Sequence, residues 1–137
     1  MKLYIREPGT ERLLRLTASS LSHQFAILAL AKVEFSSAVR RRARVGDLDG
    51  ASASQLMESF KVHQQTRFLT QGVNDLVLDS ACQLIDQYPL RAYDAIQLAG
   101  CLALKSVASE APVFACADRQ LLEAAEAEGL IWLDPTE

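Results

Sequence analysis

LRAYDAIQLAGCLAL, residues 90–104, is the stretch that decides the fold, because it is apolar on almost every side of a helix. At about 100° per residue, its alanine, isoleucine, leucine and cysteine side chains leave little polar surface. A helix of this kind is predicted to lie inside the protein. Asp94 falls in its first turn, where a carboxylate loses hydration unless another group compensates for the loss.

Shorter apolar runs on both sides of this helix predict strands, and the segments between them predict further helices. Because strands alternate with helices, the pattern predicts an α/β fold with a mainly parallel sheet. We find no repeat or linker, so residues 1–137 are predicted to form a single domain. The predicted strands are 25–30, 73–79, 113–117 and 130–133, and the other predicted helices are a short one from Thr10, 31–44, 52–69, 80–87 and one from Asp118 to Gly129.

Composition narrows the class of protein. Half of the 137 residues are hydrophobic and 23% are charged, which is typical of a globular chain. No apolar run approaches the length of a membrane span, and the first residues lack the pattern of a signal peptide. Cys82, Cys101 and Cys116 are predicted to be reduced, buried thiols of a cytoplasmic protein. His23 and His63 share no ligand spacing with them, which argues against zinc, and His63 is expected to be an ordinary helix residue.

The charged residues are unevenly distributed along the chain. A net charge of −3 does not favour a nucleic-acid partner, yet Arg40, Arg41, Arg42 and Arg44 form a dense basic run. This run can be a solvated helix end, where cations suit the helix dipole. It can equally be an edge that contacts phosphate or a partner.

Three acids follow strands or open helices in this scheme: Glu34, Asp94 and Asp118. Each has an ordinary explanation by itself, since Asp118 suits a helix N-cap, Asp94 a helix dipole, and Glu34 can face water. However, strand ends and helix starts gather along one edge of a parallel sheet, which is where ligands bind. The three carboxylates are therefore candidates for one cleft.

A cluster of carboxylates restricts the possible chemistry. Two of them about 5 Å apart repel by roughly 3 kcal/mol at an effective dielectric near 20, so a cluster needs a cation or a shared proton. Mg²⁺ prefers oxygen ligands and is held by a few carboxylates together with water and phosphate. A site made only of acids therefore points to metal-assisted attack of water on a phosphodiester.

Residues 90–104, followed by VFACADRQLLEAAEAEGLIWLDP (113–135), closely resemble the C-terminal half of PIN domains, especially those of VapC-type toxins. The shared pattern is an Asp in the first turn of a helix, then a strand, an Asp-Arg pair and an Ala/Glu-rich helix. LALAKVEFSSAVRRR (28–42) resembles the second motif of the family, and KLYIREPGTERLL (2–14) resembles the segment that follows its first motif. The similarity covers essentially the whole chain.

This resemblance implies a PIN-like three-layer sandwich and an endoribonuclease that depends on Mg²⁺ or Mn²⁺. Proteins of this kind are usually restrained by a small cognate antitoxin and are often homodimers. By motif position, Glu34, Asp94 and Asp118 correspond to the catalytic, metal-binding acids. Arg119 would then contact substrate phosphate, and Arg40 and Arg41 would steer RNA toward the cleft.

The sequence departs from the family at its start. PIN domains begin with an apolar strand that ends in Asp, whereas Met1 stands where the following helix is already under way. The first strand and its acid are therefore missing from the pattern. Three explanations are open: a true start upstream, a deliberate cut, or a shortened protein whose half-sheets pair directly or borrow a neighbour's strand.

Two other functions remain alternatives to the nuclease. A truncated PIN-like module can keep the fold and the partner surface without turnover, since loss of one metal ligand can abolish activity. In a purely structural α/β subunit the three acids would be helix caps that never converge.

Overall fold

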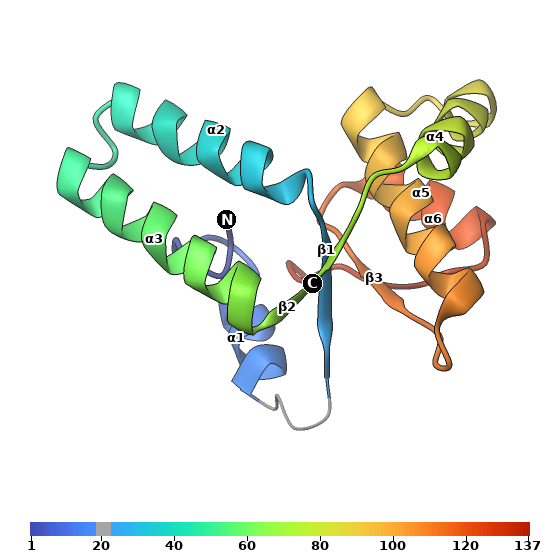
Figure 1. Ribbon diagram of the computed structural model, residues 1–137, viewed down its shortest axis with the longest axis horizontal. Helices are drawn as coiled ribbons and strands as arrows, with labels where there is room; N and C mark the ends of the chain where they lie inside the picture. Colours follow the sequence, from blue (N-terminus) through green and yellow to red (C-terminus); the bar gives the residue numbers. More distant parts are fainter. Residues whose placement is uncertain (19–22) are drawn as a thin grey trace. The chain divides into compact units, whose positions relative to one another are not determined.

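The computed structural model describes residues 1–18 and 23–137 (Figure 1). The described chain divides into two compact units: unit 1 comprises residues 1–7 and 13–72, and unit 2 comprises residues 8–12 and 73–137. The elements, in chain order, are α1 (Thr10–Ala18), β1 (Phe25–Leu28), α2 (Ala31–Arg44), α3 (Gly50–Thr66), β2 (Phe68–Gln71), α4 (Asp75–Gln87), α5 (Ala92–Val107), β3 (Val113–Ala115), α6 (Arg119–Ala127) and β4 (Ile131–Leu133).

Unit 1 is built on a helical hairpin of α2 and α3, which run side by side in Figure 1. The Asp49 carboxylate caps α3 by accepting a 2.7 Å hydrogen bond from the backbone N–H of Ser52. The hairpin connects β1 to β2, and these strands pair in parallel from Phe25 opposite Phe68 to Leu28 opposite Gln71. A long connection of this kind is what two parallel neighbours require.

Aromatic side chains form the core of unit 1. The rings of Phe35 and Phe60 stack with centroids 4.3 Å apart, which ties α2 to α3. Tyr4 places its ring edge-on to both, and its hydroxyl lies 2.8 Å from Nδ1 of His63. Burial raises the pKa of Tyr4 to about 12, so this hydroxyl keeps its proton. His63 is thus a hydrogen-bonded helix residue, as the sequence suggested.

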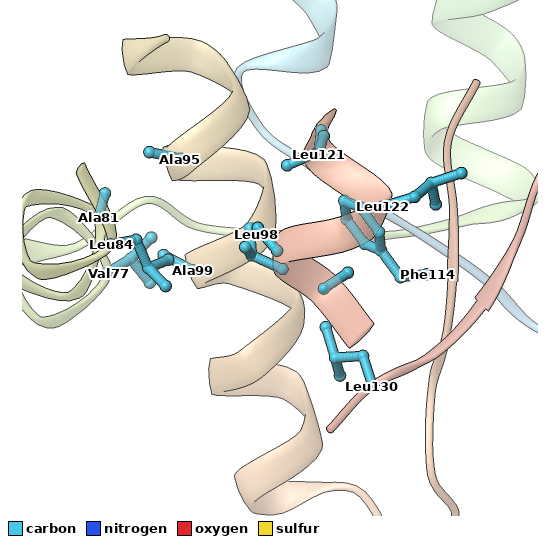
Figure 2. Packing of buried hydrophobic residues seen from close by; sticks show 12 residues of the cluster. Val77, Ala81, Leu84, Ala95, Leu98, Ala99, Phe114, Leu121, Leu122 and Leu130 are labelled. Carbon is cyan, nitrogen blue, oxygen red and sulfur yellow. The ribbon is translucent and has the colours of Figure 1, made fainter. Parts of the chain in front are cut away.

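Unit 2 is organised around α5, which lies between two other helices (Figure 2). Ala99 points toward Val77 and Leu84 of α4, whereas Leu98 points toward α6 on the other side. Leu98 and Ala99 are completely buried, at 0% exposure. The sequence of α5 is apolar on most of its sides because two different helices cover it.

Strands β3 and β4 add a small parallel sheet to unit 2. They pair from Val113 opposite Ile131 to Ala115 opposite Leu133, with α6 as the connection between them. Phe114 turns into the core with α5 and α6, while Val113 and Ile131 are exposed. This sheet therefore buries one of its faces against the helices.

A short N-terminal strap, residues 8–12, completes unit 2. The guanidinium of Arg12 donates hydrogen bonds to the carbonyl oxygens of Asp134, at 2.9 Å, and Glu137, at 2.7 Å. Gly9 has φ +89°, and a Cβ built on it would lie only 2.6 Å from the carbonyl oxygen of Pro135. Only glycine combines this left-handed backbone with such a close approach.

The sequence prediction of a strand over 73–79 is wrong, because α4 occupies Asp75–Gln87. Its alternating residues do not line a strand: Val77, together with Ala81 and Leu84, falls on one buried side of a helix. The Asn74 side chain caps this helix by accepting a 3.0 Å hydrogen bond from the N–H of Val77. The predicted helix 52–69 ends earlier, at Thr66, and the residues after it form β2.

Two predictions of burial are also only partly right. Tyr93 in the first turn of α5 is 55% exposed, so this helix is less enclosed than its composition suggests. Cys82 is exposed on α4, whereas Cys101 and Cys116 are half-buried, and all three thiols are free. Cys82 lies beside the buried line of α4 rather than on it, which is the reason for its exposure.

The mixed α/β class and the parallel pairing are confirmed, but the described strands form two separate two-stranded sheets instead of one central sheet. No described strand pairs with the second edge of β1 or of β3. Among the helices of the described chain, none is both long and apolar enough to cross a bilayer.

Substituting Gly9 by alanine tests the strap. Gly46 also has positive φ, +84°, but a Cβ there meets nothing within 4 Å, so Gly46→Ala is the matched control. We expect Gly46→Ala to lower the free energy of unfolding by about 1–2 kcal/mol, because alanine disfavours the left-handed conformation. Overpacking against Pro135 should add roughly 1–3 kcal/mol for Gly9→Ala. Urea unfolding measures both variants, and equal losses would contradict the close approach.

Candidate functional site

Asp94 lies in the first turn of α5, at the end of unit 2 where this helix begins. The residue before the helix, Arg91, has an extended backbone and makes no side-chain cap. The Asp94 side chain is half-buried rather than enclosed. Asp94 is the acidic residue in the first turn of α5, where the helix dipole favours a negative charge.

Asp118 is the N-cap of α6. One of its carboxylate oxygens accepts a 3.1 Å hydrogen bond from the N–H of Leu121. Its own backbone N–H donates to the sulfur of Cys116 at 3.2 Å. The expected capping role of Asp118 is thus confirmed, and it fixes the carboxylate at the start of the helix.

The charge of Asp118 acts on Asp94, although 23 positions of sequence lie between them. Burial raises the pKa of Asp94, the negative charge of Asp118 raises it further, and Arg91 partly offsets both. The Cys116 thiol lies in the same field: burial raises its pKa most, and the charges of Asp118 and Asp94 add to the effect. The starts of α5 and α6 therefore create one negative region.

This negative region has a consequence for stability. Because the pKa of Asp94 is raised in the folded state, its protonated form is the better accommodated one. The contribution of Asp94 to stability is fully present below its unfolded pKa and is lost as pH rises through the folded pKa. At neutral pH the two carboxylates thus repel, and a bound cation would relieve the repulsion.

The other predicted site residues are distributed over both units. In unit 2, Arg119 is exposed and forms ion pairs with Glu123, at 3.6 Å, and Glu137, at 3.5 Å. In unit 1, Glu34 lies half-buried in the first turn of α2, and Arg40 and Arg41 are exposed in the last turns of that helix. The structure thus brings two of the predicted acids together in one unit, and Glu34 belongs to the other unit.

The surroundings of Glu34 are also charged. Burial lowers the pKa of the Met1 amino group, while Glu7 and Glu34 act to raise it. Glu7 in turn forms ion pairs with Lys2, at 3.9 Å, and with Arg42. Arg42 is therefore engaged within unit 1, unlike the exposed arginines beside it in the basic run.

The donor chemistry of the Asp94–Asp118 pair fits a hard divalent cation. Mg²⁺ is commonly bound through one or two carboxylates, with water and phosphate as its other ligands. Within residues 1–18 and 23–137 no group of three or more His, Cys, Asp or Glu side chains is placed to hold a metal ion. The pair therefore offers a partial ligand set.

Sequence reasoning missed two neighbours of this pair, Arg91 and Cys116. The signal for Cys116 was its position two residues before Asp118, where a capping turn brings a side chain back to the backbone. Arg91 directly precedes α5, so its charge acts on the first turn of that helix.

Comparison of the chain with models of known protein families and with curated proteins finds no match.

Replacement of Asp118 by asparagine should lower the pKa of Asp94. The negative charge of Asp118 is the second cause of the raised value, and burial, the first cause, would remain. NMR titration of the Asp94 side-chain carboxyl carbon measures this change. Asp86→Asn, on the exposed side of α4 in the same unit, is the control and should leave the Asp94 curve in place. A titration midpoint that Asp118→Asn does not lower would contradict the coupling.

The three thiols should differ sharply in reactivity. Burial raises the pKa of Cys101 to about 11 and also raises that of Cys116, whereas Cys82 is exposed. Because the thiolate is the reactive form, we expect Cys82 to react first with a thiol reagent at pH 8. Stopped-flow kinetics with a Cys82→Ser variant assigns the fast phase. A fast phase that persists in this variant would contradict the assignment.

Proposed function

We propose that the chain is a metal-dependent endoribonuclease of the PIN type, the toxin of a toxin–antitoxin module. The observation that carries the proposal is the coupling of Asp94 to Asp118 at the starts of α5 and α6. A carboxylate whose ionisation is opposed by the charge of a second carboxylate favours a bound cation. The ion expected there is Mg²⁺ or Mn²⁺, for which carboxylate oxygens are suitable ligands.

In this proposal Asp94 and Asp118 are catalytic acids that bind the metal, and motif position gives Glu34 the same role. A divalent ion, when bound, lowers the pKa of a water molecule and stabilises charge that develops on phosphate. The capping hydrogen bond from Leu121 orients the Asp118 carboxylate before the ion binds. Arg119 approaches the substrate phosphate only if it leaves its ion pairs with Glu123 and Glu137.

Exposed arginines on α2 support an RNA substrate. Arg40, Arg41 and Arg44 form no ion pair with another described residue, so their charges are available to phosphate. They also occupy the last turns of α2, where the helix dipole favours cations without any ligand. RNA affinity that falls steeply with salt would distinguish steering from this structural role.

The proposed fold is a single PIN-like domain over residues 1–137, a three-layer sandwich for which these residues do not include the family's first strand. The sheets β1–β2 and β3–β4 have two strands each, fewer than the roughly four to six that are most common in sheets. An upstream or neighbouring strand that ends in Asp would supply both the missing pairing and another acid. The partners proposed with this fold are RNA, a cognate antitoxin and a second copy in a homodimer, in the cytoplasm and without a membrane.

One observation favours the second candidate, a catalytically inactive PIN-like binding or structural module. The described residues hold only a partial set of metal ligands, with no group of three or more. Loss of a ligand can abolish turnover and leave the architecture intact. Calorimetric titration with Mn²⁺ separates the candidates, because a dissociation constant far above millimolar would favour the inactive module.

Cleavage of single-stranded RNA by the purified chain tests the nuclease directly. We expect cleavage with Mg²⁺ or Mn²⁺ that EDTA abolishes. Asp94→Asn and Asp118→Asn should each reduce the rate by at least about 100-fold, because each removes a direct metal ligand and loss of mere supporting groups already costs 10–100-fold. Asp86→Asn, an exposed acid of α4, is the matched control and should retain activity.

The assay is repeated with an Asp-bearing strand restored upstream of Met1. Activity that appears only in the longer chain would assign the missing acid to the site. The enzymatic proposal fails if neither chain cuts RNA, or if the Asp94 and Asp118 variants cleave as fast as the unchanged protein.

A further inference from the structure

α4 has one side that packs against α5 and three sides that do not. Val77, Ala81 and Leu84 form the buried line, spaced i, i+4 and i+7. The residue that follows each of these three points about 100° further around the helix. Those following residues form a second line, Leu78, Cys82 and Ile85. We call these three residues the α4 stripe. A helix that packs on one side only does not need this second apolar line.

The α4 stripe is exposed to solvent. Leu78 is 41% exposed and Ile85 is 42% exposed, and Cys82 is exposed as well. The stripe extends over about two turns of α4, which is long enough for another helix to pack along it.

Three aspartates run beside the α4 stripe on the outer side of the helix: Asp75, Asp79 and Asp86. None of them forms an ion pair with another described residue, and α4 contains no basic side chain. Asp75 is stabilised by the helix dipole because it lies in the first turn. Asp79 lies four residues later and repels Asp75, since both side chains are negative. Asp86 lies in the last turn, where the helix dipole disfavours a negative charge. The charges of Asp79 and Asp86 thus have no stabilising role within α4.

We propose that the α4 stripe and its three aspartates bind an amphipathic helix of a basic partner protein. Leucine-like residues of that helix would cover Leu78, Cys82 and Ile85, and its lysines or arginines would pair with the aspartates. Charge complementarity selects this partner over a second copy. In a second copy, the basic helix would be α2. Its exposed side has only one apolar residue in line with the arginines, Val33, which is too little to cover the α4 stripe. The proposal does not depend on the nuclease.

The probe is a synthetic helical peptide of about 18 residues, with leucines spaced i, i+4, i+7 and i+11 and lysines beside them. We expect binding to the full chain, measured by calorimetry without metal or RNA, that weakens as salt increases. Modification of the Cys82 thiol should slow when the peptide is bound. A peptide of the same composition with its order shuffled, so that it has no apolar side, is the control ligand.

Variants of α4 then locate the site. Asp79→Lys combined with Asp86→Lys should weaken binding by about tenfold or more, and so should Leu78→Ser combined with Ile85→Ser. Leu76→Ser is the matched control, because Leu76 is 78% exposed on another side of the same helix. Circular dichroism confirms that each variant remains helical.

The proposal is overturned if the peptide does not bind, if the shuffled peptide binds equally well, or if Leu76→Ser weakens binding as much as the paired variants do. It is also overturned if the chain alone dimerises and Leu78→Ser with Ile85→Ser makes it monomeric, because a second copy would then cover the stripe. RNA cleavage enters none of these outcomes, so failure here is distinct from failure of the nuclease.

Discussion

The packing of α5 between α4 and α6 is the constraint on which unit 2 depends. Leu98 and Ala99 are adjacent residues of α5, but Leu98 packs toward α6 and Ala99 packs toward α4. Because both side chains are fully buried, neither α4 nor α6 can shift without opening a packed contact. The same packing sets the electrostatics. Because α6 lies against α5, Asp118 at the start of one helix acts on Asp94 at the start of the other. The negative region is therefore a product of apolar packing.

Much of the secondary structure could be predicted from the sequence, for reasons that particular residues make clear. The helix over 31–44 was correct at both ends, since an apolar run precedes it and Gly46 follows it. Residues 73–79 misled because Leu76 and Leu78 are spaced as on one face of a strand. The decisive signals were the Asn74 cap and the spacing of Val77 from Ala81 and Leu84. The separation into two sheets was not predictable, because strand pairing depends on contacts distant in sequence.

The candidate site was predictable only in part. Motif position selected Asp94 and Asp118 as candidates. The effect of Asp118 on Asp94 could not be read from a local pattern, because it depends on how two helices pack. The charge distribution was partly visible as well: the arginines of α2 form an obvious run, whereas the aspartates of α4 emerge as one line only when their segment is recognised as a helix. A net charge of −3 conceals this separation into a basic helix and an acidic one.

The strap of residues 8–12 links folding to the order of synthesis. Its partners, the carbonyl groups of Asp134 and Glu137, lie 122 and 125 positions further along the chain. On the ribosome, the strap emerges long before those partners exist and must wait unbound while unit 1 is made. Unit 2 can close only after residues 134–137 have been made, and the entropy of that long loop is lost at this step. A segment that is made before either partner is thus among the last parts of unit 2 to become native.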